Sequence, residues 1–373
     1  MRFKTLLFAA MVVVSTCCSA CNSKGASENE AEAKDSTKHL SLLFAGDLMN
    51  HQGQINVAKQ ADGTYDYTEC FQFIKDEIES ADVAIANFET TLAGPPYKGY
   101  PQFCAPDQFL VDAVAAGFDI MLTANNHVCD TYGKGIDRTI AVMDSLKVPH
   151  LGSYRNAQER EKNYPYLLEK NGFRIVLLNY TYATNGIKVP EGRVVNTPID
   201  TAQISKDIAK AKTMKPDAII ANMHWGVEYT LTPVKEQTKI ADWLFSKGVT
   251  HVIGNHPHVV EPVEVRTDAQ GNKHVLVYSL GNFISNMSKG STVGGQMVRI
   301  DLEKDSTTRV ANCDYSLYFV TPAPANGHKQ YRVYPASTPD TQLNAREKEI
   351  KNRFLGIVRP FFKKNNKNVK ERL

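Results

Sequence analysis

Five short polar clusters, each placed where an apolar run ends, constrain the fold of this chain more than any other feature. They are Ala45-Gly46-Asp47, Asn87-Phe88-Glu89, Ala124-Asn125-Asn126-His127, Met223-His224-Trp225-Gly226 and Asn255-His256-Pro257-His258. Short apolar runs of this kind are typical of buried parallel strands, and open α/β sheets bind ligands at the carboxyl ends of such strands. We therefore expect acids, amides and imidazoles to converge on one edge of a sheet.

Apolar runs alternate with helical patterns over most of the chain. Strands are predicted at 40–45, 83–86, 120–123, 174–178, 218–221 and 251–254, with helices at 67–80, 107–116, 133–146, 201–214 and 233–246. This alternation indicates a mainly parallel sheet covered by helices. The later strands, predicted at 259–267, 274–278, 296–302 and 315–320, have no helices between them. They indicate a second, more antiparallel sheet packed on the first, so the expected fold class is an α/β layered sandwich.

The N-terminal residues resemble a bacterial export signal. Arg2 and Lys4 precede a short apolar run in residues 1–20, and the run is too short to span a bilayer. Cys18-Ser19-Ala20-Cys21 resembles a lipobox, which predicts lipidation of Cys21; an ordinary soluble secretory signal is the alternative. We therefore expect an extracytoplasmic, membrane-anchored lipoprotein on the periplasmic side or the cell surface.

The rest of the chain is divided by composition. Residues 21–38 are rich in Ser, Glu, Ala and Lys without apolar periodicity, which predicts a flexible tether. Residues 39–322 form the expected folded domain, and 323–373 a connector followed by a basic C-terminal helix. That helix is either a solvated element or a surface for an anionic polymer or lipid head groups. The formal charge is only +3, and the sequence has no basic stripe with interleaved aromatic residues. We therefore expect no nucleic-acid partner.

The first two clusters supply acids. Gly46 permits a sharp turn that would place Asp47 at a strand tip, although a helix cap is an alternative role for this aspartate. Asn87 and Glu89 flank Phe88, so alternation along a strand turns both polar side chains to the same face. That spacing suits two ligands of one metal centre.

The third cluster combines an amide with an imidazole. Three consecutive polar side chains, Asn125 to His127, would be costly to bury unless they are satisfied. A phosphoesterase-like site uses such an asparagine as a metal ligand and the adjacent histidine as a proton donor to the leaving oxygen, so we expect these roles for Asn126 and His127. Asp130 follows three residues later and is expected to orient His127.

The last two clusters supply imidazoles. His224 ends an apolar run, and His256 and His258 flank Pro257, which should hold His256 extended and turn both rings to one side. With the acids and Asn126, these histidines predict a divalent metal ion, manganese, zinc or iron. Expected substrate contacts are Glu228, Tyr229 and Asn282, whereas His51 is expected to be a surface or packing residue.

In this order the motifs resemble those of the CapA family of bacterial capsule-synthesis proteins, named for poly-gamma-glutamate capsule formation. The resemblance covers about residues 40–283 and includes Gly-Asp, Asn-Phe-Glu, Ala-Asn-Asn-His, His-Trp-Gly-x-Glu-Tyr, His-Pro-His-Val and Tyr-Ser-Leu-Gly-Asn-Phe. The family is similar in fold to calcineurin-like metallophosphoesterases, which implies a four-layer αββα sandwich with two central sheets. It also implies that Asp47 is the first acidic ligand, that Glu89 or Asn87 bridges, and that Asn126 and the three histidines complete the set.

Two departures from the phosphoesterase pattern affect the expected chemistry. Met49 stands where that pattern has histidine, and the Asn87/Glu89 pair replaces a bridging aspartate. A two-metal hydrolytic mechanism is therefore not implied.

Three functions remain open from the sequence. The first is a lipid-anchored CapA-like protein acting in synthesis, export or attachment of an anionic capsular polymer such as poly-gamma-glutamate, alongside capsule-synthesis partner proteins. The second is a general metal-dependent phosphoesterase in which His127 protonates the leaving oxygen. The third is a metal-free polymer-binding module on an enzyme-derived fold, which fits the departure at Met49.

Overall fold

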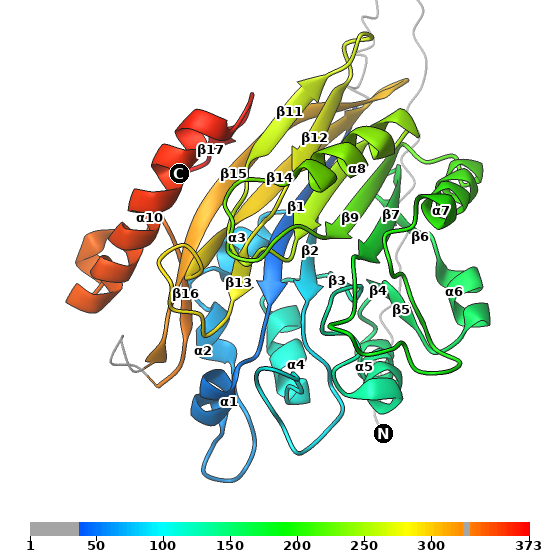
Figure 1. Cartoon of the computed structure of the whole chain (residues 1–373). Helices are drawn as coiled ribbons and strands as arrows, with labels where there is room; N and C mark the ends of the chain where they lie inside the picture. Colours follow the sequence, from blue (N-terminus) through cyan, green and yellow to red (C-terminus); the bar gives the residue numbers. More distant parts are fainter. Residues whose placement is uncertain (1–36, 324–328) are drawn as a thin grey trace, which may run out of the picture. The chain divides into compact units, whose positions relative to one another are not determined.

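Two β-sheets lie face to face at the centre of the fold, with helices on their outer sides (Figure 1). The computed structural model describes residues 37–323 and 329–373, which belong to one folded unit. The predicted signal peptide, the lipidation site Cys21 and nearly all of the tether lie outside the described residues. Within the described ranges, no helix combines the length and the apolarity needed to cross a membrane.

The larger sheet contains both ends of the described chain. Its strands are β1 (Lys38–Leu48), β2 (Val83–Phe88), β3 (Ile120–Leu122), β4 (His150–Leu151), β13 (Asn282–Ile284), β14 (Gly294–Lys304), β15 (Thr308–Thr321), β16 (Arg332–Pro335) and β17 (Lys370–Glu371). They follow the order β16-β15-β14-β1-β2-β3-β4, with β13 paired to β1 and β17 to β15. The pairs β1–β2, β2–β3 and β3–β4 are parallel, so these strands end on the same edge.

The smaller sheet is formed by the middle of the chain. Its strands are β6 (Tyr166–Lys170), β7 (Phe173–Thr181), β9 (Ala218–His224), β10 (His251–Asn255), β11 (Val263–Thr267) and β12 (Lys273–Val277), in the order β11-β12-β10-β9-β7-β6. A separate two-stranded sheet pairs β5 (Ser153–Tyr154) with β8 (Val194–Val195). Because β7, β9 and β10 are mutually parallel, their carboxyl ends also share one edge.

Burial of both faces of β1 explains the layering. Leu42 and Phe44 join the core between the sheets, whereas Leu43 and Ala45 point to the opposite side and pack with the outer helices. The helices outside the larger sheet are α1 (Gln52–Ala58), α2 (Thr68–Phe71), α3 (Lys75–Glu79), α4 (Asp107–Ala115) and α5 (Tyr132–Ser145). Outside the smaller sheet lie α6 (Ala157–Asn163), α7 (Thr201–Thr213) and α8 (Lys235–Ser246). The four-layer αββα sandwich is confirmed.

The division of strands between the sheets differs from the prediction. The segments of β14 and β15 were expected to belong to a separate antiparallel sheet, but they extend the first sheet beyond β1. β11 and β12 instead complete the sheet of β7, β9 and β10. An apolar pattern identifies a strand but not its neighbour, because pairing depends on contacts between segments far apart in the chain.

The C-terminal segment is an integral part of the folded unit. The expected connector contains β16, which pairs with β15, and a short 3-10 helix, η1 (Asp340–Gln342). Helix α10 (Ala345–Asn365) buries Phe354, Val358 and Phe362 in the core, and β17 pairs with β15 beyond it. Another difference is that the helix expected at 67–80 is split into α2 and α3.

Candidate metal centre

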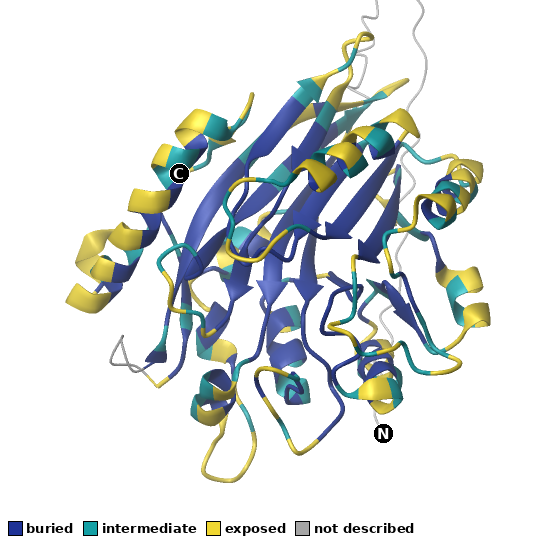
Figure 2. Ribbon diagram, viewed as in Figure 1, coloured by how far each residue is buried: buried dark blue, intermediate teal, exposed yellow. Residues whose placement is uncertain are grey.

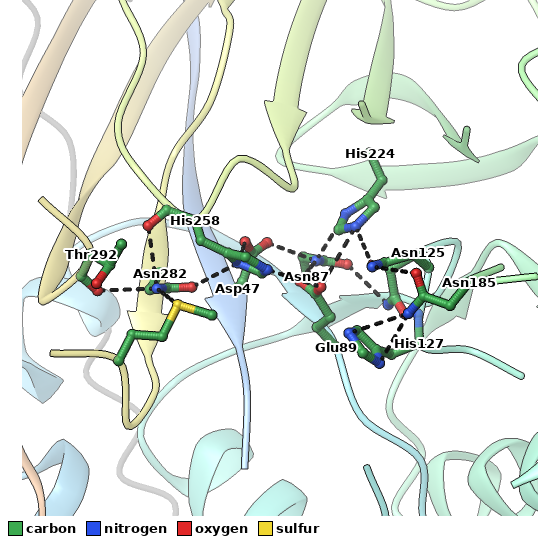
Figure 3. A network of polar contacts seen from close by, with 12 residues as sticks. Asp47, Asn87, Glu89, Asn125, His127, Asn185, His224, His258, Asn282 and Thr292 are labelled. Carbon is green, nitrogen blue, oxygen red and sulfur yellow. Dashed lines mark hydrogen bonds and ion pairs between the residues drawn. The ribbon is translucent and has the colours of Figure 1, made fainter. Parts of the chain in front are cut away.

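The carboxyl ends of strands from both sheets meet at one buried polar cluster (Figure 3). Its side chains come from β1, from the ends of β2 and β9, and from the turns after β3 and β10. The cluster consists of Asp47, Asn87, Glu89, Asn126, His127, His224, His256 and His258, each at most 4% exposed. The prediction that these motifs converge is therefore confirmed as a spatial arrangement.

Glu89 lies at the centre of this cluster. Its Oε2 accepts a hydrogen bond of 3.0 Å from Asn87 Nδ2, whereas Oε1 has no hydrogen-bond partner among the described residues. Oε1 faces two imidazoles, at 3.6 Å from His224 Nε2 and 3.9 Å from His258 Nε2. Burial and then the neighbouring Asp47 raise the pKa of Glu89 well above its usual value. A buried carboxylate oxygen left in this state is costly unless a cation compensates it.

Asn87 presents its amide N–H groups to the carboxylates. Asn125 Oδ1 accepts from His127 N, so Asn125 Nδ2 is the donor to the carbonyl of Phe88 and to Asn87 Oδ1. Asn87 Nδ2 must then face Asp47 Oδ1 at 2.8 Å and Glu89 Oε2 at 3.0 Å. Of the two bridging ligands that the sequence left open, the structure favours Glu89, and Asn87 instead holds the two acids in place.

His258 is oriented by Asn282. Asn282 Nδ2 donates to the carbonyls of His258 and Thr292, so its Oδ1 is an acceptor, and His258 Nδ1 lies 3.0 Å from it. His258 Nδ1 therefore carries a proton and donates it to Asn282 Oδ1, and this contact turns Nε2 toward Glu89 Oε1. Asn282 is completely buried and its contacts lie within the protein, so its expected role in substrate binding stays a prediction.

The backbone around Pro257 is not extended as predicted. His256 has φ 104° and His258 has φ 57°, both in the left-handed region that non-glycine residues rarely adopt. Both rings still face the cluster, where His256 packs 4.8 Å from the ring of His224. Two such residues cost of order 1–3 kcal/mol each, and such strain concentrates at functional sites.

His256 is neutral and has an unpaired ring nitrogen. Burial, and then the nearby His258, lower the pKa of His256 to about 3, and burial lowers the pKa of His224 well below its usual value. His256 Nδ1 has no hydrogen-bond partner in the described part of the chain. Neutral imidazoles are the form in which histidine binds metals.

The amide and imidazole of the third cluster occupy the side of the centre next to β3. Asn126 Oδ1 lies 2.8 Å from His224 Nε2. His127 Nδ1 donates to Asp130 Oδ2 at 2.7 Å, and that same carboxylate oxygen accepts from the backbone N–H of Phe103. Asp130 thus contacts His127 as predicted and is itself held by the loop before α4.

Three overlapping sets of side chains could hold a metal ion. They are Glu89 with His224 and His256, Asp47 with Glu89 and His258, and Glu228 with His256 and His258. Glu89 belongs to two of these sets, which is the position of a bridging carboxylate. The nitrogen and oxygen donors suit manganese, zinc or iron, and the unpartnered oxygen of Glu89 shows that these residues fit such an ion.

The expected substrate contacts at the rim are exposed, unlike the cluster. Glu228 and Tyr229 lie on the loop between β9 and α8. The ring of Tyr229 is 6.2 Å from that of His258, and its backbone N–H donates to Pro257 O. These two residues therefore form an exposed rim beside the buried cluster.

Sequence reasoning missed several residues of the site. His51, expected to be a surface or packing residue, lies near His258 and His127, and burial, more than these neighbours, lowers the pKa of His51 to about 4. Asn185 Oδ1 accepts from Asn126 Nδ2, and its Nδ2 lies 3.4 Å from His127 Nδ1. The ring of Tyr182 is 4.6 Å from that of His256. Tyr182 and Asn185 follow the end of β7, so the strand-end rule applied to that strand would have found them.

Another buried carboxyl, Glu261, follows β10 in the sequence. It is 1% exposed, and its Oε2 accepts from Gln237 Nε2, while Oε1 lacks a hydrogen-bond partner among the described residues. Gln237 Oε1 in turn accepts from Val234 N at the start of α8. Burial raises the pKa of Glu261 to about 8.

Glu261→Gln should stabilise the protein at pH 8.5 much more than at pH 5. Since the folded-state pKa lies above the unfolded value of about 4.5, the folded state binds more protons between these values and stability falls as pH rises through them. Removing the charge should raise the free energy of unfolding by up to about 4 kcal/mol at the higher pH. Thermal melting at both pH values measures this effect. The exposed control Glu236→Gln should change little, and an equal shift at both pH values would contradict the argument.

Comparisons with known proteins agree with the motif order. The family described as bacterial capsule synthesis protein PGA_cap matches residues 41–287. The chain is 26% identical over 317 residues to the capsule biosynthesis protein CapA of Bacillus anthracis, covering 82% of this chain and 74% of that relative. It is also 26% identical over 315 residues to the PGA biosynthesis protein CapA of Bacillus subtilis (strain 168), covering 82% and 79%.

Solved structures with more distant similarity include two proteins of Thermus thermophilus. A 5'-nucleotidase precursor has a TM-score of 0.47 and 12% identity, covering 87% of this chain and 59% of its own. The sulfate thiohydrolase SoxB has a TM-score of 0.40 and 13% identity, covering 79% and 46%. The family match spans most of the folded chain and contains every residue of the buried cluster, so this chain belongs to the bacterial capsule synthesis protein family PGA_cap, the CapA family.

Proposed function

We propose that this protein acts on an anionic capsular polymer, in its synthesis, export or attachment, by means of a divalent metal ion held in the buried cluster. The observation that carries this proposal is the buried Glu89 Oε1, which lacks a hydrogen-bond partner among the described residues and faces imidazoles from two different segments. The names of the two relatives, which refer to capsule and PGA biosynthesis, support the polymer context.

The ligands of the proposed centre divide into two groups. Asp47, Glu89 and His258 form one, while Glu89, His224 and His256 form the other, with the amide oxygen of Asn126 beside His224. A divalent ion bound there would act as a Lewis acid toward an oxygen of the substrate. The buried position keeps the donors in fixed orientations, since each is held by packing or a neighbouring hydrogen bond.

His127 is the proposed proton donor. Its Nδ1–H is held by Asp130, which leaves Nε2 to carry and release a proton at the leaving atom. Asn185 Nδ2 lies 3.5 Å from this nitrogen. The same arrangement supports the second function, a general metal-dependent phosphoesterase, because protonation of a leaving oxygen is the step that such a residue supplies.

The proposal also includes two expectations from the sequence. The protein is expected to be anchored by a lipid on Cys21 and to lie outside the cytoplasm. Their support is the lipobox-like segment before the tether. Fractionation of cells into membrane and soluble material tests them. A protein found only in the soluble fraction would contradict the anchor without affecting the metal centre.

Metal analysis of the purified protein tests the proposed function. We expect near-stoichiometric manganese, zinc or iron in the wild-type protein and a loss of that metal in the Asp47→Ala/His256→Ala variant. His127→Ala should keep the metal, because His127 belongs to none of the ligand sets, and should lose any hydrolysis of a model phosphodiester. Absence of metal from the wild-type protein after gentle purification would favour the metal-free polymer-binding module instead.

A further inference from the structure

Exposed cations line the outward face of α10 and continue onto the loop beside the metal centre. We call Lys289, Arg353, Lys363 and Lys364 the α10 strip; all four are exposed. Figure 2 shows that α10 is buried toward the sheet and exposed on its other side. None of the four forms an ion pair with another described residue. Neighbouring basic residues differ, since Lys351 pairs with Asp340 and Arg359 with Glu371.

The strip is joined to the exposed rim of the metal centre by direct contacts. Gly290 lies so close to α10 that a Cβ there would be 2.9 Å from Ile357 Cδ1, and Arg353 Nη2 is 3.5 Å from Ser288 O. Lys289 Nζ lies 4.7 Å above the ring of Tyr229, which belongs to that rim. The loop of residues 285–292 therefore connects the helix to the rim of the site.

Apart from the contacts of Arg353 and Ile357 with the loop, the outward face of α10 does little to hold the helix in place. Docking relies on the opposite side, where Phe354, Val358 and Phe362 are buried. On the outward side a Cβ at Gly356 would meet nothing within 4 Å, and Ile357 is 37% exposed. Arg353 and Lys364 are eleven residues apart, so the cations extend over about 16 Å of helix. Unpaired like charges on one face repel each other unless an anion lies against them.

We propose that the α10 strip binds a linear polyanion with repeated carboxylates and holds it against the exposed rim of the metal centre. This inference rests on the proposed function, in which such a polymer is the substrate. Charge complementarity selects an anionic partner. The continuity between strip and rim selects a flexible chain over a flat membrane, because a chain can follow the surface from the helix to the buried centre.

Binding of fluorescently labelled polyglutamate to the full-length protein in detergent tests the strip. The Arg353→Glu/Lys363→Glu/Lys364→Glu variant should bind at least about tenfold more weakly at low ionic strength and show a shallower dependence on salt. The control Lys212→Glu/Lys235→Glu/Lys239→Glu changes the net charge equally on α7 and α8, and should bind nearly as the wild type does. Circular dichroism and melting confirm that both variants are folded.

The outcomes separate the strip from the metal centre. We expect the strip variant to keep its metal, and the Asp47→Ala/His256→Ala variant to lose metal but keep polymer affinity. The inference about the α10 strip would be overturned if the strip variant and its control bound polyglutamate equally well, or if the wild-type protein did not bind it. Neither result would affect the metal test. Strip-dependent binding to vesicles containing anionic lipid, without binding to polyglutamate, would assign the surface to a membrane and also overturn the inference.

Discussion

Glu89→Gln is expected to remove most of the bound metal while making the metal-free protein more stable. Glu89 belongs to two of the three ligand sets, so loss of its charge weakens both at once. Glutamine keeps the length of the side chain and an oxygen that can accept from Asn87 Nδ2. In the absence of metal, however, the wild-type carboxylate is buried, lies near Asp47 and has its pKa raised. Neutralising it should therefore stabilise the metal-free fold, by about 1–3 kcal/mol at neutral pH.

Metal content and thermal melting, each with and without chelator, measure these two effects of opposite sign. Glu228→Gln is the matched control because Glu228 is exposed at the rim and belongs to a single ligand set. The control should keep most of its metal and melt like the wild type after chelation. If the Glu89→Gln variant kept its full metal content, Glu89 would not be a ligand. Independently, if the metal-free variant melted at a lower temperature than the metal-free wild type, burial of the Glu89 charge would not be unfavourable.

The sequence predicted this site where the chemistry depends on short-range geometry. Asn87 and Glu89 were placed on one face because side chains alternate along a strand, and the bond between Asn87 Nδ2 and Glu89 Oε2 confirms that placement. The contact between His127 and Asp130 likewise spans three residues. Convergence of the clusters followed from one rule, that parallel strands present their carboxyl ends at a common edge.

Prediction failed where the local backbone is determined by distant contacts. His256 precedes Pro257 and adopts a left-handed conformation that this position disfavours, and His258 after the proline is left-handed as well. The carbonyl and the ring of His258 are tied to Asn282, which is remote in sequence and whose burial could not be read from its motif. The same limitation applies to the sheets, since β14 pairs with β1 across most of the chain. Asn185 was missed because its polar segment follows a strand without forming a recognised motif.

Gly46 shows how a residue can be identified correctly for the wrong reason. The sequence suggested that this glycine permits a sharp turn before Asp47. In the structure, Gly46 is not among the glycines with positive φ. Its role is close approach, because a Cβ at this position would lie 1.9 Å from Gly281 O and 2.9 Å from Gly281 C. Asp47 N donates to that same carbonyl at 3.0 Å, and Asp47 is paired in register with Asn282.

Gly46→Ala is therefore expected to destabilise the protein by about 3 kcal/mol or more and to reduce metal binding. The obstructing atoms belong to the backbone and cannot rotate away, so β1 and β13 must move apart. That movement would separate Asp47 from His258, which Asn282 holds in place, so stability and metal content should fall together. Denaturant unfolding and metal analysis measure both quantities.

Gly356→Ala on α10 is the matched control, because it adds the same single methyl group at another glycine. A Cβ there meets nothing within 4 Å, and alanine favours helix over glycine, so this variant should gain up to about 1 kcal/mol. A Gly46→Ala protein that unfolded like the wild type would mean that β1 and β13 can separate at little cost. In that case the distances that define the ligand sets would not be enforced by the sheet, and the pre-formed arrangement of Asp47, Glu89 and His258 could not explain metal binding.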